Sequence, residues 1–303
     1  MRIVSLVAVG MCKPKTIVLT IGTRIEMMVS ETVNLWLAGP MTFLRKLAIS
    51  VVVAVGLAVL CLAVLWPLVR YQRRRFESMA TCAAKFHAGK STAADAEDFL
   101  RTFQRGALVE HRDCAPTECI YEVLVSNFML SVKKDGAGPD YDSWSNIQFL
   151  RMLGIRPGVA ITRFTIRGGV VQEVFFGTAY QDNAGQWIWA SWEAQDELSD
   201  YASCWALAAG HPTYIVSHTH TGSGPFSGLS VSSIFSEHAT QSDRTRCLRI
   251  RFECMTRPRE CGRLAFMPQV QEDIEAEDVL RKDITKQYEA SVSDCHRKKG
   301  LLP

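Results

Sequence analysis

The sequence predicts an α+β protein, with one N-terminal transmembrane helix and then a single domain whose mostly antiparallel sheet is flanked by helices. Three observations lead to this fold class. An uncharged apolar run occupies residues 47–69, period-two alternation dominates the middle of the chain, and helical spacing occurs on both sides of it. No repeat or low-complexity linker divides the residues after the run, so we expect one domain there. The expected segments are a leader at 1–40, a transmembrane helix at 44–70, a helical stalk with the first helices at 71–106, and the α+β soluble domain at 107–303.

The apolar run is the clearest feature of the sequence. It extends from Leu47 to Val69, 23 residues without a charge, and a helix of that length covers roughly 35 Å against a hydrocarbon core of about 30 Å. Buried core helices rarely run this long without a polar residue. A cleaved signal peptide has a shorter apolar region and a small-x-small cleavage site, whereas Arg70 and three further arginines follow here. We therefore expect a retained signal-anchor that crosses the lipid bilayer with residues 47–69.

The first 40 residues show neither clean periodicity nor turn chemistry. They precede a second methionine, Met41, from which a short basic segment with Arg45 and Lys46 leads into the apolar run. Signal-anchors have this arrangement. We expect residues 1–40 to be a disordered leader or the product of a mis-assigned start, with translation beginning at Met41.

The net charge of +3 is unevenly distributed along the chain. Residues 1–75 contain 10 Lys/Arg and two acids, whereas residues 76–303 contain 24 Lys/Arg and 29 Asp/Glu. The large C-terminal part is therefore mildly acidic. Nucleic acid is not an expected partner, because binding a polyanion requires a net positive surface.

Eight of the ten cysteines follow the apolar run. An even number at this density is typical of an oxidising compartment, in which disulfides persist. Cys114 and Cys119 are candidates for a local bridge because Pro116 turns the chain between them. Structural zinc and buried thiols stay open as alternatives. The arginines after the run favour a cytoplasmic domain by the positive-inside rule, but we give the cysteines more weight and expect an extracytoplasmic domain.

Local patterns predict the elements of the domain. Ser91 or Thr92 begins a helix that runs to Gly106. Gly168 and Gly169 supply the two positive-φ positions of a hairpin turn within residues 159–176. Further strands are expected at 119–132, 186–194, 213–220 and 247–254, a short helix at 143–153, and a final helix within 272–296.

Arginine is concentrated late in the domain. Residues 168–243 carry eight acids and no base, and residues 244–263 carry seven arginines against two glutamates. An arginine-bearing strand that pairs with acidic neighbouring strands explains this distribution without a ligand. The functional alternative is contact with anions or lipid headgroups through Arg249 and Arg251, which share one face of the expected strand.

Two histidines are the candidate metal ligands. His218 and His220 lie on one face of an expected strand. With a carboxylate such as Glu237 or Asp243 they could hold a zinc ion that activates water. His-x-His alone is a weak motif, however, and surface histidines beside a glycine-rich turn are the simpler interpretation.

Three tryptophans lie close together in the strand expected at 186–194. Trp187 and Trp189 share one face, and Trp192 lies on the other. Paired indoles can form a platform for sugars or a protein partner. Aromatic side chains are more often part of a core, which is the interpretation we favour.

The sequence contains no nucleophile elbow, P-loop or dinucleotide-binding fingerprint, and we expect no cofactor. Two functions fit what is present. The first is a non-enzymatic binding or assembly module of the cell envelope, with a protein partner that the sequence does not identify. The second is a membrane-tethered, metal-dependent hydrolase that uses His218 and His220. We favour the first.

Overall fold

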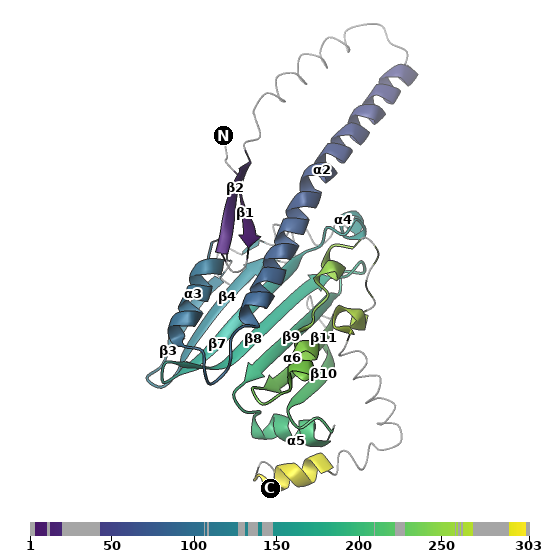
Figure 1. Ribbon diagram of the computed structural model, residues 1–303. Coiled ribbons are helices and arrows are strands. Elements are labelled where there is room, and N and C mark those ends of the chain that lie inside the picture. Colours follow the sequence, from purple (N-terminus) through teal and green to yellow (C-terminus); the bar gives the residue numbers. More distant parts are fainter. Residues whose placement is uncertain are drawn as a thin grey trace. The chain divides into compact units, whose positions relative to one another are not determined.

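The structure is a computed structural model. It describes residues 4–10, 13–19, 43–105, 107, 109–126, 131–132, 139–140, 148–208, 210–221, 228–257, 259, 261, 263–268 and 291–300 (Figure 1). The chain forms two compact units, Met1–Tyr71 and Gln72–Pro303.

The first unit contains a hairpin and most of a long helix. Strands β1 (Val4–Gly10) and β2 (Lys13–Leu19) pair antiparallel within the segment expected to be a leader. Helix α2 (Phe43–Ala83) begins in this unit and contains the whole apolar run. Most of the described side chains of the run are exposed, with Val52 at 70% and Val59 at 60%, whereas Val69 at its end is 4% exposed. Among the described helices α2 is the one long and apolar enough to cross a membrane. The prediction of an apolar N-terminal helix is thus confirmed, whereas translation from Met41 stays a prediction.

The second unit is built around a seven-stranded mixed sheet in the order β10-β11-β9-β8-β7-β4-β3. Neighbouring strands pair antiparallel except β11 and β9, which are parallel, so the expected α+β class with a mostly antiparallel sheet is confirmed. The strands are β3 (Val109–Cys114), β4 (Cys119–Ser126), β7 (Gly158–Arg167), β8 (Val170–Gln181), β9 (Trp187–Gln195), β10 (Tyr214–Thr221) and β11 (Gly228–Ser236). A separate pair joins β5 (Ser131–Val132) and β6 (Pro139–Asp140).

The helices of the second unit connect and cover the sheet. They are α3 (Ala93–Phe103), α4 (Gln148–Met152), α5 (Asp200–Ala208), α6 (Gln241–Leu248), the 3-10 helices η1 (Phe252–Met255) and η2 (Arg263–Phe266), and a terminal helix at 291–298. In Figure 1, α3 and α6 lie on the same side of the sheet. Helix α5 connects β9 to β10, and the β10–β11 hairpin then returns the chain beside β9 in the parallel direction.

One face of the sheet forms the core. Phe164 of β7 contacts Phe86 and Phe99, at 4.6 and 5.1 Å between ring centroids, in segments that follow α2. Phe252 of η1 packs against Phe176 of β8 at 6.2 Å. Because apolar burial is the main favourable term in folding, these contacts hold the helical layer on the sheet.

The end of α2 belongs to this core rather than to a stalk. Phe76, Met79 and Ala83 are at most 1% exposed and recur at helical spacing. Arg75 donates hydrogen bonds to the main-chain carbonyls of Phe103 and Arg105 at the end of α3. The segment expected to be a stalk therefore includes the first covering element of the domain.

Residues 247–254 were expected to form a strand, and this prediction is wrong. Cys247 lies in the last turn of α6, and Phe252 and Cys254 lie in η1. The physical reason is local capping, because the Thr240 hydroxyl accepts a hydrogen bond from the main-chain N–H of Asp243 and starts a helix. The apolar alternation in these residues reflects burial beside the sheet and not a strand.

The turn between β7 and β8 is as expected. Gly168 and Gly169 have φ of 59° and 78°. Both values lie in the left-handed region that glycine adopts without steric cost, as a two-residue hairpin turn requires.

The N-cap of α3 leads to a first prediction. Thr92 and Asp95 form a reciprocal capping box, in which each side chain accepts a hydrogen bond from the other residue's main-chain N–H. We expect Thr92→Ala to lower the free energy of unfolding by about 1 kcal/mol, measured by urea denaturation of the full-length protein in detergent micelles. Thr102→Ala is the control, because Thr102 lies in the same helix and only donates to the carbonyl of Asp98. An equal loss in both variants would contradict a capping role.

Candidate functional site

The arginines of residues 244–263 do not form one array. Arg244 is buried and pairs with Glu237. Arg249 is exposed at the C-cap of α6, and Arg251 pairs with Glu253 at 3.0 Å. Of the two predicted anion contacts, therefore, Arg249 is exposed to solvent and Arg251 already has a partner.

A group of charges forms where η1 meets the part of α2 that belongs to the second unit. Nη1 of Arg73 donates a hydrogen bond to the Thr256 hydroxyl at 3.1 Å. Arg73 also pairs with Glu77, one turn further along α2, at 3.1 Å. The hydrogen bond to Thr256 fixes the end of η1 beside Arg73.

The same group extends along η1. Glu253 pairs with Arg251 at 3.0 Å and lies 3.9 Å from Arg257. Arg74, beside Arg73 on α2, acts electrostatically on Glu77. We define the arginine cluster by the six residues Arg73, Arg74, Glu77, Arg251, Glu253 and Arg257.

The two carboxylates of the arginine cluster differ in their electrostatics. Burial, the largest effect, raises the pKa of Glu77, and the charge of Glu253 also raises it, so that together they outweigh Arg73 and Arg74. Burial would also raise the pKa of Glu253, but main-chain and Arg251 hydrogen bonds and the charges of the arginines hold it below its usual value. Four arginines against two glutamates leave an excess of positive charge, to which an anion can bind.

A second ionic group lies at the end of β11. The Glu237 side chain is 5% exposed and accepts hydrogen bonds from Nη1 of Arg244 at 2.8 Å and from the main-chain N–H of Ala88 at 3.1 Å. Its other contact is Nδ1 of His87 at 2.9 Å. The guanidinium of Arg244 also lies over the ring of Phe235, 5.5 Å from its centroid. This group connects the segment after α2 to β11 and α6.

The predicted metal ligands lie on the edge strand β10. In the ladder His218 is opposite Val231 and His220 is opposite Leu229, and their side chains lie outside the described residues. The carboxylates considered as further ligands have other partners, since Glu237 binds Arg244 and Asp243 binds the N-cap Thr240. Within the part of the chain that the structure describes, no three His, Cys, Asp or Glu side chains could hold a metal ion together.

Six cysteines of the domain form three bridges among the described residues, including the predicted one. Cys114 and Cys119 are at disulfide distance across the β3–β4 hairpin. Cys254 pairs with Cys261, and Cys204 of α5 pairs with Cys295 of the terminal helix. Cys247 is buried.

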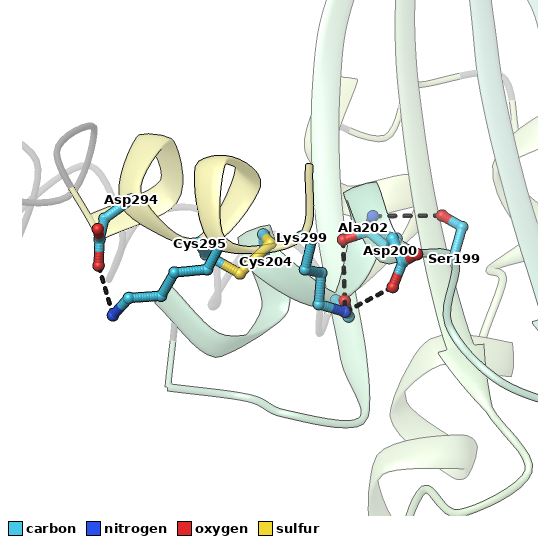
Figure 2. The surroundings of a disulfide bond; sticks show 9 residues. Ser199, Asp200, Ala202, Cys204, Asp294, Cys295 and Lys299 are labelled. Carbon is cyan, nitrogen blue, oxygen red and sulfur yellow. Dashed lines mark hydrogen bonds and ion pairs between the residues drawn. A yellow bond between two sulfur atoms is a disulfide. The ribbon is translucent and has the colours of Figure 1, made fainter. Parts of the chain in front are cut away.

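The Cys204–Cys295 bridge is part of a larger contact. Lys299 pairs with Asp200 at 2.7 Å and donates to the Ser203 hydroxyl at 2.8 Å (Figure 2). The rings of Tyr201 and His296 stack with centroids 4.7 Å apart. Closing a loop with a sequence separation of 91 residues stabilises a fold by about 4 to 5 kcal/mol in the chain-entropy description.

The face of the sheet opposite the core is half-exposed except where Val159, Ala179 and Trp187 are buried, and we call it the open face. A row of register partners crosses it from Arg163 through Phe175 and Glu193 to Ile234. Arg163 lies over the Phe175 ring, 5.3 Å from the centroid. A Cβ at Gly177 would lie 3.0 Å from the Phe175 ring, so glycine is the residue that lets this ring lie close to the sheet.

The tryptophans divide between the two faces as expected. Trp192 lies in the core and stacks with Phe176 at 5.7 Å. Trp187 is also buried, with Val159 and Ala179, on the side of the open face. Trp189 stays half-exposed beside Trp187, with ring centroids 6.1 Å apart. The core interpretation is therefore confirmed for two of the three.

Sequence reasoning missed the pairing of distant residues. Nothing in the sequence pattern brings Arg73 to Thr256 or His87 to Glu237, because each contact joins segments more than 140 residues apart. One local signal for this region is nevertheless present in the sequence. Thr240 and Asp243 have the spacing of an N-cap and its acidic partner, which would have predicted α6 and thereby the position of Arg244.

Comparison with known proteins adds no relative. No protein-family model, no curated protein and no solved structure matches this chain.

The buried ion pair leads to a second prediction. Burial would raise the pKa of Glu237, but hydrogen bonds from His87 and Arg244 and their charges hold it below its usual value. The ionised carboxylate therefore stabilises the fold above its unfolded pKa of about 4.3, and this contribution is lost as the pH falls through the lower folded pKa. We expect the free energy of unfolding to fall between about pH 5 and pH 3, with a smaller fall in Glu237→Gln.

Urea denaturation of the full-length protein in detergent over this pH range measures the effect. Glu237→Gln should also be less stable at pH 7 by about 3 kcal/mol, because it leaves Arg244 buried without a charged partner. Asp98→Asn is the control, since this carboxylate is 77% exposed on α3. A pH dependence in Glu237→Gln equal to that of the natural protein would contradict the role of this pair.

Proposed function

We propose that this chain is a single-pass membrane protein whose α+β domain lies outside the cytoplasm and acts as a non-enzymatic binding or assembly module of the envelope. The observation that carries the proposal is the uncharged and largely exposed helix over residues 47–69, followed in the same chain by a disulfide-bonded domain.

The helix supports membrane anchoring through the cost of exposing apolar surface. Burying a fully exposed Val or Leu side chain gains about 1.5–3 kcal/mol of free energy. The side chains of Val52, Leu57 and Val59 are at least 54% exposed and do not make this gain in water. A bilayer removes this cost and satisfies the backbone within the helix. Near the end of the run, the guanidinium of Arg70 lies 5.3 Å from the Trp66 ring centroid, and Trp and Arg are typical of the membrane–water interface.

The disulfides support the orientation. Three pairs within the domain are at bonding distance, and structural disulfides are rare where thiols are kept reduced. This argument opposes the positive-inside tendency of the arginines after the run. Arg73 and Arg75 bind groups of the domain itself, so these contacts account for them without a role in setting the topology.

The open face supports a binding role. It combines half-exposed aromatic and aliphatic side chains, Phe175, Trp189 and Ile161, with the charges of Arg163 and Glu193. Protein–protein interfaces are enriched in aromatic residues and arginine. We assign partner binding to this face, on a scaffold held rigid by the core on its other side.

Membrane anchoring gives the third prediction. We expect the full-length protein to stay in the membrane pellet after extraction at alkaline pH. Leu57→Arg places a charge near the middle of the run, at a cost of about 3 kcal/mol, and should shift the protein toward the soluble fraction. Leu57→Phe is the control and should stay in the pellet. Recovery of the natural protein in the soluble fraction would reject the proposal.

The compartment gives the fourth prediction. When thiols are alkylated at lysis, non-reducing peptide mass analysis should recover linked peptides for Cys204–Cys295 and Cys254–Cys261. Reduction before alkylation is the control and should separate them. A domain recovered with these four cysteines alkylated at lysis would place it in a reducing compartment and contradict the orientation.

A further inference from the structure

We propose that the arginine cluster is a binding surface for the headgroups of anionic phospholipids. The inference rests on the proposed membrane anchoring and adds the lipid class that the domain contacts. The observation behind it is that η1 lies against the part of α2 that follows the apolar run. Arg251 and Arg257 are thereby grouped with Arg73 and Arg74.

The position of the cluster follows from chain continuity. Arg73 comes four residues after Val69 within α2, which in a helix is a rise of about 6 Å. With the run in the hydrocarbon core, Arg73 and Arg74 lie at headgroup level. The hydrogen bond from Arg73 to Thr256 holds the end of η1 at the same level.

The charges of the cluster fit phosphate. The Arg257 side chain is 53% exposed and Arg74 is also exposed, so both can reach an anion. Arg73 and Arg251 are 24% and 32% exposed and are paired with Glu77 and Glu253. These ion pairs hold Arg73 and Arg251 in place. The exposed guanidiniums of Arg74 and Arg257 supply planar pairs of N–H donors, which match two oxygens of a phosphate group.

A lipid surface suits this arrangement better than a diffusing anion. A cluster tethered within one or two turns of a membrane helix meets headgroups at a very high local concentration. Each arginine near an anionic surface contributes about 1 kcal/mol, or about fivefold in affinity.

The test uses the full-length protein in nanodiscs of phosphatidylcholine mixed with phosphatidylglycerol. After release, native mass spectrometry measures how many molecules of each lipid stay bound. We expect phosphatidylglycerol to be enriched, and the double variant Arg74→Gln/Arg257→Gln to lower its binding about 25-fold, which is fivefold for each arginine. Glu77→Gln removes an acid from the cluster and should raise the binding.

The matched control is Arg101→Gln/Arg112→Gln, which removes two exposed, ion-paired arginines on α3 and β3. It should keep the enrichment. The inference is overturned if the natural protein retains the two lipids equally, or if the control variant loses as much phosphatidylglycerol as the double variant. It is also overturned if inorganic phosphate at millimolar concentration displaces the bound phosphatidylglycerol. A protein that does not enter the nanodiscs at all would instead reject the membrane anchoring itself.

Discussion

Burial of one face of the seven-stranded sheet is the constraint on which the second unit depends. The covering side chains come from three distant parts of the chain, around Phe86 and Phe99, Phe252, and Phe266. No single part could cover the sheet alone, so the fold needs fixed junctions between them. Two buried arginines lie at such junctions, Arg156 beside η1 and Arg244 beside the segment that contains Phe86.

The junctions use buried charges with several partners each. The Arg156 side chain donates to the carbonyl of Cys254 and to Asn183, at 2.9 Å each, and thereby joins η1 to the β8–β9 turn. Arg244 and Glu237 join α6 to the segment after α2. Removing one partner of such a pair costs far more than the pair contributes in net stability. These residues therefore fix which arrangement forms, and the aromatic contacts supply most of the energy.

Local patterns in the sequence predicted local structure well. The apolar helix, the hairpin at Gly168 and Gly169 and the α3 cap depend on neighbouring residues, and all three are present. The strand expected at 247–254 was wrong because the alternation came from tertiary burial. The contacts of the arginine cluster could not be predicted, since the Arg73–Thr256 hydrogen bond spans 183 residues and follows only from the packing of η1 on the core.

The bridge between α5 and the terminal helix has a consequence for biosynthesis. During synthesis Cys247, Cys254 and Cys261 all emerge after Cys204 and before Cys295. Three cysteines that are nearer in the sequence are therefore available to the Cys204 thiol before Cys295 is synthesised. Early oxidation favours short, incorrect loops with them. Correct maturation then depends on exchange through mixed disulfides, so producing this chain with its Cys204–Cys295 bridge should require a cell with an active disulfide isomerase.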